Sequence, residues 1–339
     1  MKALVIGGGG SKGAFAVGVL KYIHQNVQPI DTFDIYSGTS TGSLISPLAL
    51  LGEMDKLERV YTTSTNDDIL VKHSFGRILT DISIYDATPL LRLIERTLSG
   101  AQLAAILNSP KRLYLSGVSL QTQELVHFAT KDTPPTDAYR IARLRTAVDL
   151  QRAMLASSCQ PIYMQPIDVF RQRVEQFCDG GVRENTPLQV AVDNGATEII
   201  AISMGPKPGQ SVFSTTLLTQ AASILGFTID TFSSDVGQND YRLPQLTAAM
   251  NQYLKLVKDQ LRTNGVNPSV IASSFAAPGN PLLNKPLLKL HEIRPDVNLS
   301  TSEFGGEGGL DFNPEKMKRM LQLGFAKARQ YFTTTTPIA

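Results

Sequence analysis

Two glycine-rich turns lie near the start of the chain, and each directly follows a short apolar run. Residues 2–6 (KALVI) lead into residues 7–13 (GGGGSKG), and residues 33–36 (FDIY) lead into residues 37–42 (SGTSTG). Short apolar runs bounded by such turns are typical of buried strands, and an apolar helical pattern follows each turn. Alternating strands and helices predict an α/β fold, in which helices cover both faces of a mainly parallel sheet.

The second turn has the form Gly-x-Ser-x-Gly, with Ser40 between Gly38 and Gly42. Between a strand and a helix, this pattern is typical of a nucleophile elbow, a sharp turn that exposes the serine hydroxyl. The first turn offers backbone N–H groups at a helix start, and the Thr41 amide offers another, so that a developing negative charge is stabilised. A serine nucleophile beside an oxyanion hole indicates acyl transfer, and ester hydrolysis is the reaction that we expect.

A competing interpretation of the first turn is dinucleotide binding, because residues 8–13 match Gly-x-Gly-x-x-Gly. That motif also needs an acidic residue at the carboxyl end of the second strand, where it binds the ribose. Asp31 and Asp34 instead lie at the beginning of that strand. We therefore favour oxyanion binding. Lys12 is then either a charge near the anion site or a solvated loop lysine.

Ser40 needs a base that accepts its proton. The four histidines are His24, His73, His127 and His291. The chain order Ser40, Asp179, His291 fits an α/β-hydrolase triad, but only one strand precedes this serine, so we disfavour a histidine base. The alternative is Asp179 itself, because a partly desolvated carboxylate is a stronger base. Taken alone, Asp179-Gly180-Gly181 is typical of a plain turn.

Together, the two glycine turns and the Asp-Gly-Gly motif resemble the patatin-like phospholipases. Residues 156–161 (ASSCQP) and Asn185-x-Pro187 are similar to the segments before and after the catalytic aspartate of that family, and the resemblance covers about residues 1–205. It implies that Ser40 is the nucleophile and Asp179 the base. The glycines that would line the oxyanion hole are Gly8, Gly9 and Gly10. The residues that we expect to support the site are Lys12, Gly13, Gly38, Gly42, Gly180 and Gly181.

The same resemblance implies a three-layer α/β/α fold around a central, mostly parallel sheet, and a lipid acyl hydrolase with a Ser–Asp dyad. The implied substrates are phospholipids, lysophospholipids or neutral acyl esters, with no metal or cofactor needed for the chemistry. Such substrates imply transient contact with a membrane or micelle. An activating protein partner is compatible with this scheme, and the sequence names none. The net charge of +2 gives no electrostatic argument for nucleic-acid binding.

Residues 1–332 are predicted to form one catalytic domain with a helical excursion at about residues 212–265, followed by a disordered tail at residues 333–339. The helical pattern is expected to break near Gly237 and Pro244, since both residue types disfavour helix interiors. The abundant apolar side chains of residues 212–236 fit either a helix packed on the sheet or a lid that faces a membrane. Residues 169–177 are predicted to be extended.

We find no secretory signal and no apolar run long enough to span a membrane, so we expect a cytoplasmic protein that associates with membranes peripherally. Cys159 and Cys178 are too few for a disulfide framework and are expected to be buried and reduced. Two other functions stay open. One is an esterase or thioesterase for small soluble esters, and the other is a lipid- or nucleotide-binding protein without catalysis.

Overall fold

The computed structural model describes residues 1–72, 82–134, 136–207, 221–276, 287–306 and 309–334. The strands of its main sheet are β1 (Lys2–Ile6), β2 (Ile35–Thr39), β5 (Arg112–Ser119), β6 (Leu125–Ala129), β7 (Arg140–Arg143), β8 (Phe177–Asp179), β9 (Glu198–Ile202) and β10 (Lys289–Ile293). They lie in the order β10-β9-β1-β2-β5-β6-β7, and β8 pairs with β5. A separate small sheet joins β3 (Val71–Lys72) to β4 (Tyr85–Asp86). Neighbouring strands of the main sheet run parallel, except that β6 and β8 are antiparallel to β5.

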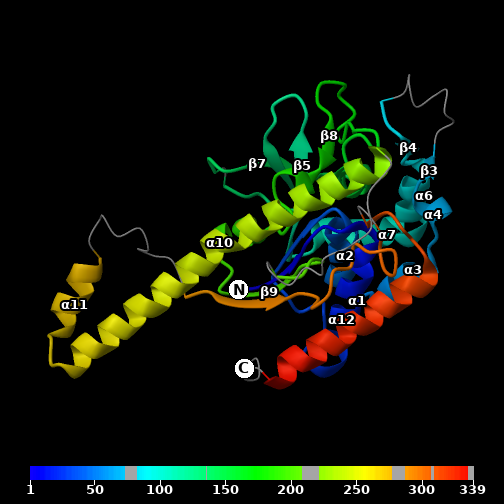
Figure 1. Ribbon diagram of the computed structural model, residues 1–339. Coiled ribbons are helices and arrows are strands. Elements are labelled where there is room, and N and C mark those ends of the chain that lie inside the picture. Colours follow the sequence, from blue (N-terminus) through cyan, green and yellow to red (C-terminus); the bar gives the residue numbers. More distant parts are fainter. Residues whose placement is uncertain (73–81, 135, 208–220, 277–286, 307–308, 335–339) are drawn as a thin grey trace.

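Helices cover both faces of the main sheet (Figure 1). The α-helices of the described residues are α1 (Gly13–Asn26), α2 (Thr41–Leu50), α3 (Met54–Thr63), α4 (Asn66–Ile69), α6 (Thr88–Thr97), α7 (Gly100–Asn108), α8 (Ala147–Ser158), α9 (Leu188–Asp193), α10 (Ala221–Thr263), α11 (Pro268–Phe275) and α12 (Pro314–Thr334). Side chains alternate across β1: Leu4 and Ile6 join the core under α1 and α2, whereas Ala3 and Val5 join the core under α9. Burial on both faces explains why this strand is a continuous apolar run. The predicted three-layer α/β/α fold is confirmed.

The first and last helices pack backbone to backbone. A Cβ atom added at Gly18 of α1 would overlap the carbonyl oxygen of Leu321, and one added at Gly324 of α12 would overlap the carbonyl oxygen of Phe15. Only glycine permits such an approach, so these two positions determine how closely α12 lies against α1. Helix α12 therefore lies in the same helical layer as α1, the helix that follows the first glycine turn.

The predicted break in the helical excursion is wrong, because α10 continues through both Gly237 and Pro244. Gly237 lies where the helix meets Asn185, and a Cβ there would be 3.1 Å from the side-chain amide nitrogen of Asn185. Its lack of a side chain therefore serves a close tertiary approach. Pro244 is buried. Its missing N–H removes only one hydrogen bond from a long helix, and the part of α10 before Pro244 packs against the rest of the protein.

Residues 169–176 are also not extended as predicted, and β8 begins only at Phe177. The Asp168 carboxylate accepts hydrogen bonds from the amides of Gln172 (3.2 Å) and Arg173 (2.7 Å), which stabilises a turn instead. A second, short helix, α11, follows α10.

Part of the predicted lid, residues 212–220, lies outside the described residues. In the part that is described, Leu225 and Ile229 pack against the core, whereas Phe227 is 58% exposed. Of the predicted tail, Thr333 and Thr334 form the end of α12, and residues 335–339 lie outside the described residues.

We expect Gly324→Val to lower the free energy of unfolding by about 1–3 kcal/mol, because its side chain would overpack the contact between α1 and α12. Gly100→Ala is the matched control, since a Cβ at that helix start meets nothing within 4 Å. Urea denaturation of both variants and wild type measures the effect. Equal midpoints for Gly324→Val and wild type would contradict the close packing.

Candidate active site

The register of the sheet brings Ser40 and Asp179 together. Strand β2 pairs with β5 as far as Thr39 opposite Ser116, and β8 pairs with β5 from the next residue onward, with Asp179 opposite Gly117. Strand β6 occupies the other edge of β5 over the same stretch, so β8 lies on the same edge as β2. Because β2 is parallel and β8 antiparallel to β5, the two strands meet end to end. The serine that follows β2 is therefore next to the aspartate that ends β8.

Ser40 lies in a left-handed backbone conformation, with φ 56° and ψ −123°. A serine in this region is strained, and the neighbouring hydrogen bonds hold it there. Its amide donates to the Ser157 hydroxyl (3.1 Å), and its carbonyl accepts from the hydroxyls of Ser43 (2.6 Å) and Ser158 (3.1 Å). The serines of residues 156–161 thus brace the elbow, a role that the motif alone did not reveal.

Asp179 is buried, with 4% of its surface exposed. One carboxylate oxygen, Oδ1, accepts a hydrogen bond from the Gly181 amide (2.8 Å), whereas Oδ2 accepts none from any residue within the described ranges. Burial raises the pKa of this carboxyl to about 6. The nearby Ser40 hydroxyl and the Gly181 amide act in the opposite direction and lower the pKa, but by less than burial raises it. A carboxylate with a free oxygen and a pKa near neutrality has the properties of a general base.

The first glycine turn faces this serine, because a Cβ at Gly8 would lie 3.0 Å from the Ser40 Cβ. The Gly8 amide is engaged: it donates to the carbonyl oxygen (3.0 Å) and the side-chain Oδ1 (3.1 Å) of Asn185. Gly8 thus lies beside Ser40 with its own amide engaged by Asn185. The amides of Gly9, Gly10 and Thr41 donate to nothing in the part of the chain that the structure describes.

Lys12 is buried, which rules out a solvated loop lysine. Its ammonium group forms an ion pair with Asp230 of α10 (3.0 Å) and donates to the Ser300 hydroxyl (2.7 Å). Lys12 therefore ties the first glycine turn to α10. A second loop packs on the same turn, since the Ser11 hydroxyl donates to the Gly305 carbonyl (3.3 Å).

The supporting glycines lie in backbone contacts around the site. A Cβ at Gly42 would overlap the carbonyl oxygen of Ile6 at the end of β1. A Cβ at Gly38 or Gly180 would likewise overlap a backbone carbonyl oxygen, whereas one at Gly13 would overlap the hydroxyl of Thr41. Gly181 instead supplies the amide that holds Asp179. Small residues at these positions allow the elbow and the first glycine turn to approach each other.

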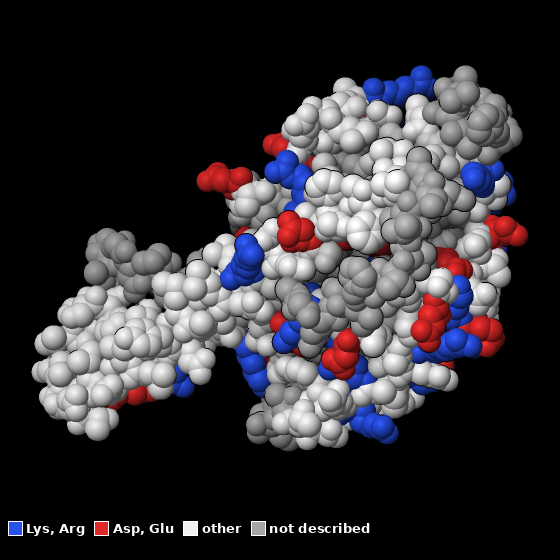
Figure 2. Space-filling model, viewed as in Figure 1, with Lys and Arg blue, Asp and Glu red and all other residues white. Residues whose placement is uncertain are grey.

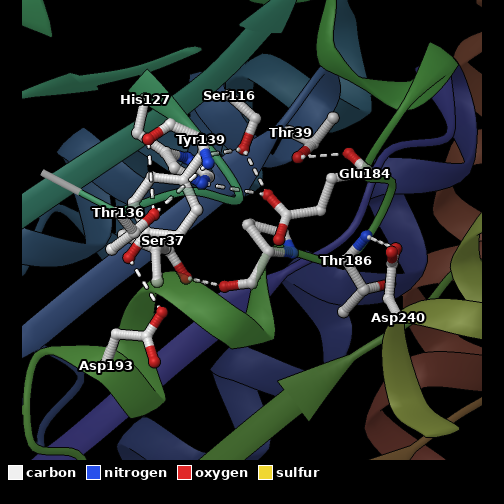
Figure 3. A network of polar contacts seen from close by, with 12 residues as sticks. Ser37, Thr39, Ser116, His127, Thr136, Tyr139, Glu184, Thr186, Asp193 and Asp240 are labelled. Atoms are coloured by element: carbon white, nitrogen blue, oxygen red, sulfur yellow. Dashed lines mark hydrogen bonds and ion pairs between the residues drawn. The ribbon is translucent and has the colours of Figure 1, made fainter. Parts of the chain in front are cut away.

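The described histidines have partners other than Ser40. His24 accepts from the Ile30 amide (3.4 Å), and His291 is buried against the Tyr331 hydroxyl (3.1 Å) and Glu198 (3.2 Å). His73 lies outside the described residues. His127 lies in a buried polar network behind the site, 3.2 Å from the Ser116 hydroxyl and 3.3 Å from Glu184 (Figure 3). Burial lowers the pKa of His127 to about 3, so it stays neutral.

Asp240 of α10 holds the loop that follows Asp179. Its Oδ2 accepts from the amides of Asn185 (2.8 Å) and Thr186 (2.7 Å), and Figure 3 shows it reaching the loop from the side opposite His127. Since Asn185 binds the Gly8 amide, Asp240 acts on the glycine turn through Asn185. Burial raises the pKa of Asp240 to about 7. The sequence motifs did not reveal this residue, because it lies on a helix outside them.

An apolar cavity opens beside the serine. Ser40, Thr41 and Gly10 contribute to its wall, and most of the remaining lining is aliphatic, including Leu48 and Ile94. The cavity has a volume of about 70 Å³. A narrow apolar space next to a serine hydroxyl suits a hydrocarbon chain better than a polar ligand.

Both cysteines are free and buried, as predicted. Burial and the neighbouring Asp179 raise the pKa of Cys178 to about 12, so its thiol stays protonated at neutral pH. Across the described parts of the chain, we find no helix with the length and apolar content needed to cross a bilayer.

The model of the Patatin-like phospholipase family matches residues 4–192, which is more than half of the chain. The chain belongs to this family. Its fold and the convergence of the motifs described above agree with that membership.

Three curated relatives are similar to parts of the chain. A "cGAMP-activated phospholipase" of Escherichia coli (strain TW11681) is 28% identical over 204 residues, 57% of this chain and 55% of that protein. A "cUMP-AMP-activated phospholipase" of Escherichia coli is 42% identical over 64 residues, 18% of this chain and 20% of that protein. The "Patatin-like phospholipase domain-containing protein 7" of Mus musculus is 27% identical over 208 residues, 60% of this chain and 14% of that protein.

The chain thus spans about half the length of the first of these relatives and less of the other two. Among solved structures, VipD from Legionella pneumophila superposes with a TM-score of 0.45 and 12% identity, over 98% of this chain and 67% of that chain.

We expect Asp179→Asn to raise the free energy of unfolding at pH 7.5 by about 1–3 kcal/mol. The folded-state pKa is raised from 3.8 to about 6, so the folded state favours the protonated carboxyl. The stability that this proton contributes is present below pH 4 and is lost as the pH rises through 6. Urea denaturation of wild type and variant at pH 4 and pH 7.5 tests this. A difference that does not change with pH would contradict it.

Proposed function

We propose that the chain is a serine lipid acyl hydrolase that cleaves fatty-acyl esters of phospholipids or lysophospholipids. One observation carries the proposal: a buried aspartate with an unpaired carboxylate oxygen lies next to a serine elbow at an apolar cavity. Membership of the patatin-like phospholipase family and relatives that are named phospholipases support it.

In the proposed reaction, the Ser40 hydroxyl oxygen attacks the ester carbonyl while the Asp179 carboxylate accepts its proton. The amides of Gly9, Gly10 and Thr41 stabilise the oxyanion, and Gly8, held by Asn185, positions the turn. The alcohol leaves with the proton from Asp179, and an acyl-enzyme remains. Asp179 then takes a proton from a water molecule, whose oxygen attacks the acyl-enzyme carbonyl. As the bond to the Ser40 oxygen breaks, Asp179 returns this proton to that oxygen, and the fatty acid is released. The apolar cavity holds the acyl chain.

We expect Ser40→Ala and Asp179→Ala each to lower kcat for p-nitrophenyl esters by about 10³-fold or more, because they remove the nucleophile and the base. His24→Ala is the matched control and should keep wild-type rates.

The wild-type kcat should fall as the pH drops through about 6, because Asp179 becomes protonated. Esters of short and long acyl chains are compared, with and without cGAMP and cUMP-AMP, since two relatives are named as activated by these nucleotides.

Activity that survives Ser40→Ala would contradict the mechanism. A preference for short esters would favour the small-ester esterase. If wild type stays inactive with both nucleotides and a serine-directed phosphonate leaves Ser40 unlabelled, the chain is a binding protein.

We expect Asp240→Ala to lower kcat by about 10- to 100-fold with little change in KM, because the Asn185 loop loses its acceptor while the acyl cavity stays intact. Asp240→Asn keeps an acceptor oxygen at the same place and should restore most of the rate. Steady-state kinetics and thermal unfolding of both variants measure this. Equal losses of activity in the Asn and Ala variants would argue against a positioning role.

A further inference from the structure

The second half of α10, together with α11, extends away from the sheet (Figure 1). The Gln245 side chain donates to the Glu292 carboxylate of β10 (3.1 Å), and the helix continues beyond this contact to Thr263. Helix α11 then folds back, so that the Lys258 ammonium lies over the ring of Phe275, 4.7 Å from its centroid. We call residues 242–276 the arm.

One face of the arm is apolar and exposed. The side chains that form it are Leu243, Leu246, Met250, Tyr253 and Leu256, which are between 41% and 66% exposed. Their spacing of three or four residues places them along one side of the helix. The buried residues of this stretch, Tyr241, Pro244 and Asn251, lie on another side. The apolar face is therefore directed away from the body, and contiguous apolar surface of this kind is usually covered by a partner or a lipid surface.

The charges of the arm favour a particular kind of partner. The arm carries four cationic side chains, Arg242, Lys255, Lys258 and Arg262, against one anionic side chain, Asp259. Figure 2 shows its visible face as mostly uncharged, with charged residues along one margin. An apolar face combined with an excess of Lys and Arg is typical of helices that lie in the headgroup region of an anionic membrane.

A partner helix fits these residues less well. In a coiled coil, the positions beside the apolar seam usually carry charges that select the partner and its orientation. Here Thr247 and Leu254 lie on one side of the seam, and Ala249 and Leu256 lie on the other. Arg242, at the very start of the arm, is the one charge beside this part of the seam, so the apolar face is wide and has no pattern of flanking charges that would specify a register. A lipid surface needs no register, whereas a helical partner does.

We propose that the arm attaches the protein to an anionic phospholipid surface, with the apolar face toward the acyl chains and the cationic side chains toward the headgroups. This inference rests on the proposed lipid substrate and adds where the protein meets the lipid. The surface lies on residues other than those of the predicted lid at residues 212–236.

The test uses the full chain with Ser40→Ala, so that vesicles stay intact during sedimentation. With the arm unchanged, this protein should bind mixed vesicles of phosphatidylglycerol and phosphatidylcholine more tightly than vesicles of phosphatidylcholine alone. Leu246→Glu combined with Leu256→Glu should weaken binding to both by roughly tenfold or more, because apolar burial is lost. Lys255→Gln combined with Lys258→Gln should weaken only the binding to anionic vesicles, and salt should do the same. Leu323→Glu, at an exposed leucine of α12, is the matched control.

Equal vesicle binding by the Leu246→Glu, Leu256→Glu variant and the control would overturn the proposal. So would a dimer in light scattering that the same variant dissociates, because a second copy would then cover this face. With Ser40 restored, the arm variants should hydrolyse soluble p-nitrophenyl esters at the wild-type rate. Vesicle binding without any ester hydrolysis would contradict the proposed function and leave the arm inference standing.

Discussion

The close approach of Gly42 to the carbonyl of Ile6 is the contact on which the candidate site depends. No side chain fits at that position, so the start of α2 can lie directly against the end of β1. The parallel register of β1 and β2 places Ile6 opposite Gly38, which brings the glycine turn and the serine elbow to the same edge of the sheet. Ser40 and Gly8 therefore face each other within the first β-α-β-α segment.

Asp179, the third component of the candidate site, is positioned by a different feature of the fold. Asp179 reaches Ser40 because β8 continues the edge of β5 where β2 ends. At that place burial makes the charged form of the carboxyl less stable than it would be in water, which raises its pKa. Nearby Glu184 is also buried, and its pKa is raised further by the charge of Asp240. The fold thus buries several acidic groups, which lowers stability at neutral pH and raises the proton affinity of Asp179, the base of the proposed reaction.

The sequence predicts those parts of the site that depend on local patterns. The Gly-x-Ser-x-Gly elbow, the two β-α units and the buried thiols follow from runs of adjacent residues. Contacts between distant segments do not. The engagement of Gly8 by Asn185, and the hold of Asp240 on that loop, join segments with no shared pattern. Gly237 misled the prediction for a related reason: its local effect is to weaken a helix, but in the fold it permits α10 to touch Asn185.

The continuity of α10 connects the candidate site with the arm. The first half of this helix contacts both sides of the site, through Asp230 on Lys12 and Asp240 on the Asn185 loop, and the same helix forms most of the arm. A helix of 43 residues spans about 65 Å at 1.5 Å per residue, and it transmits orientation along that length. A break at Gly237, as the sequence indicated, would have let the arm rotate freely. In the proposed function, an unbroken helix means that a surface which binds the arm also sets the direction from which a lipid reaches Ser40.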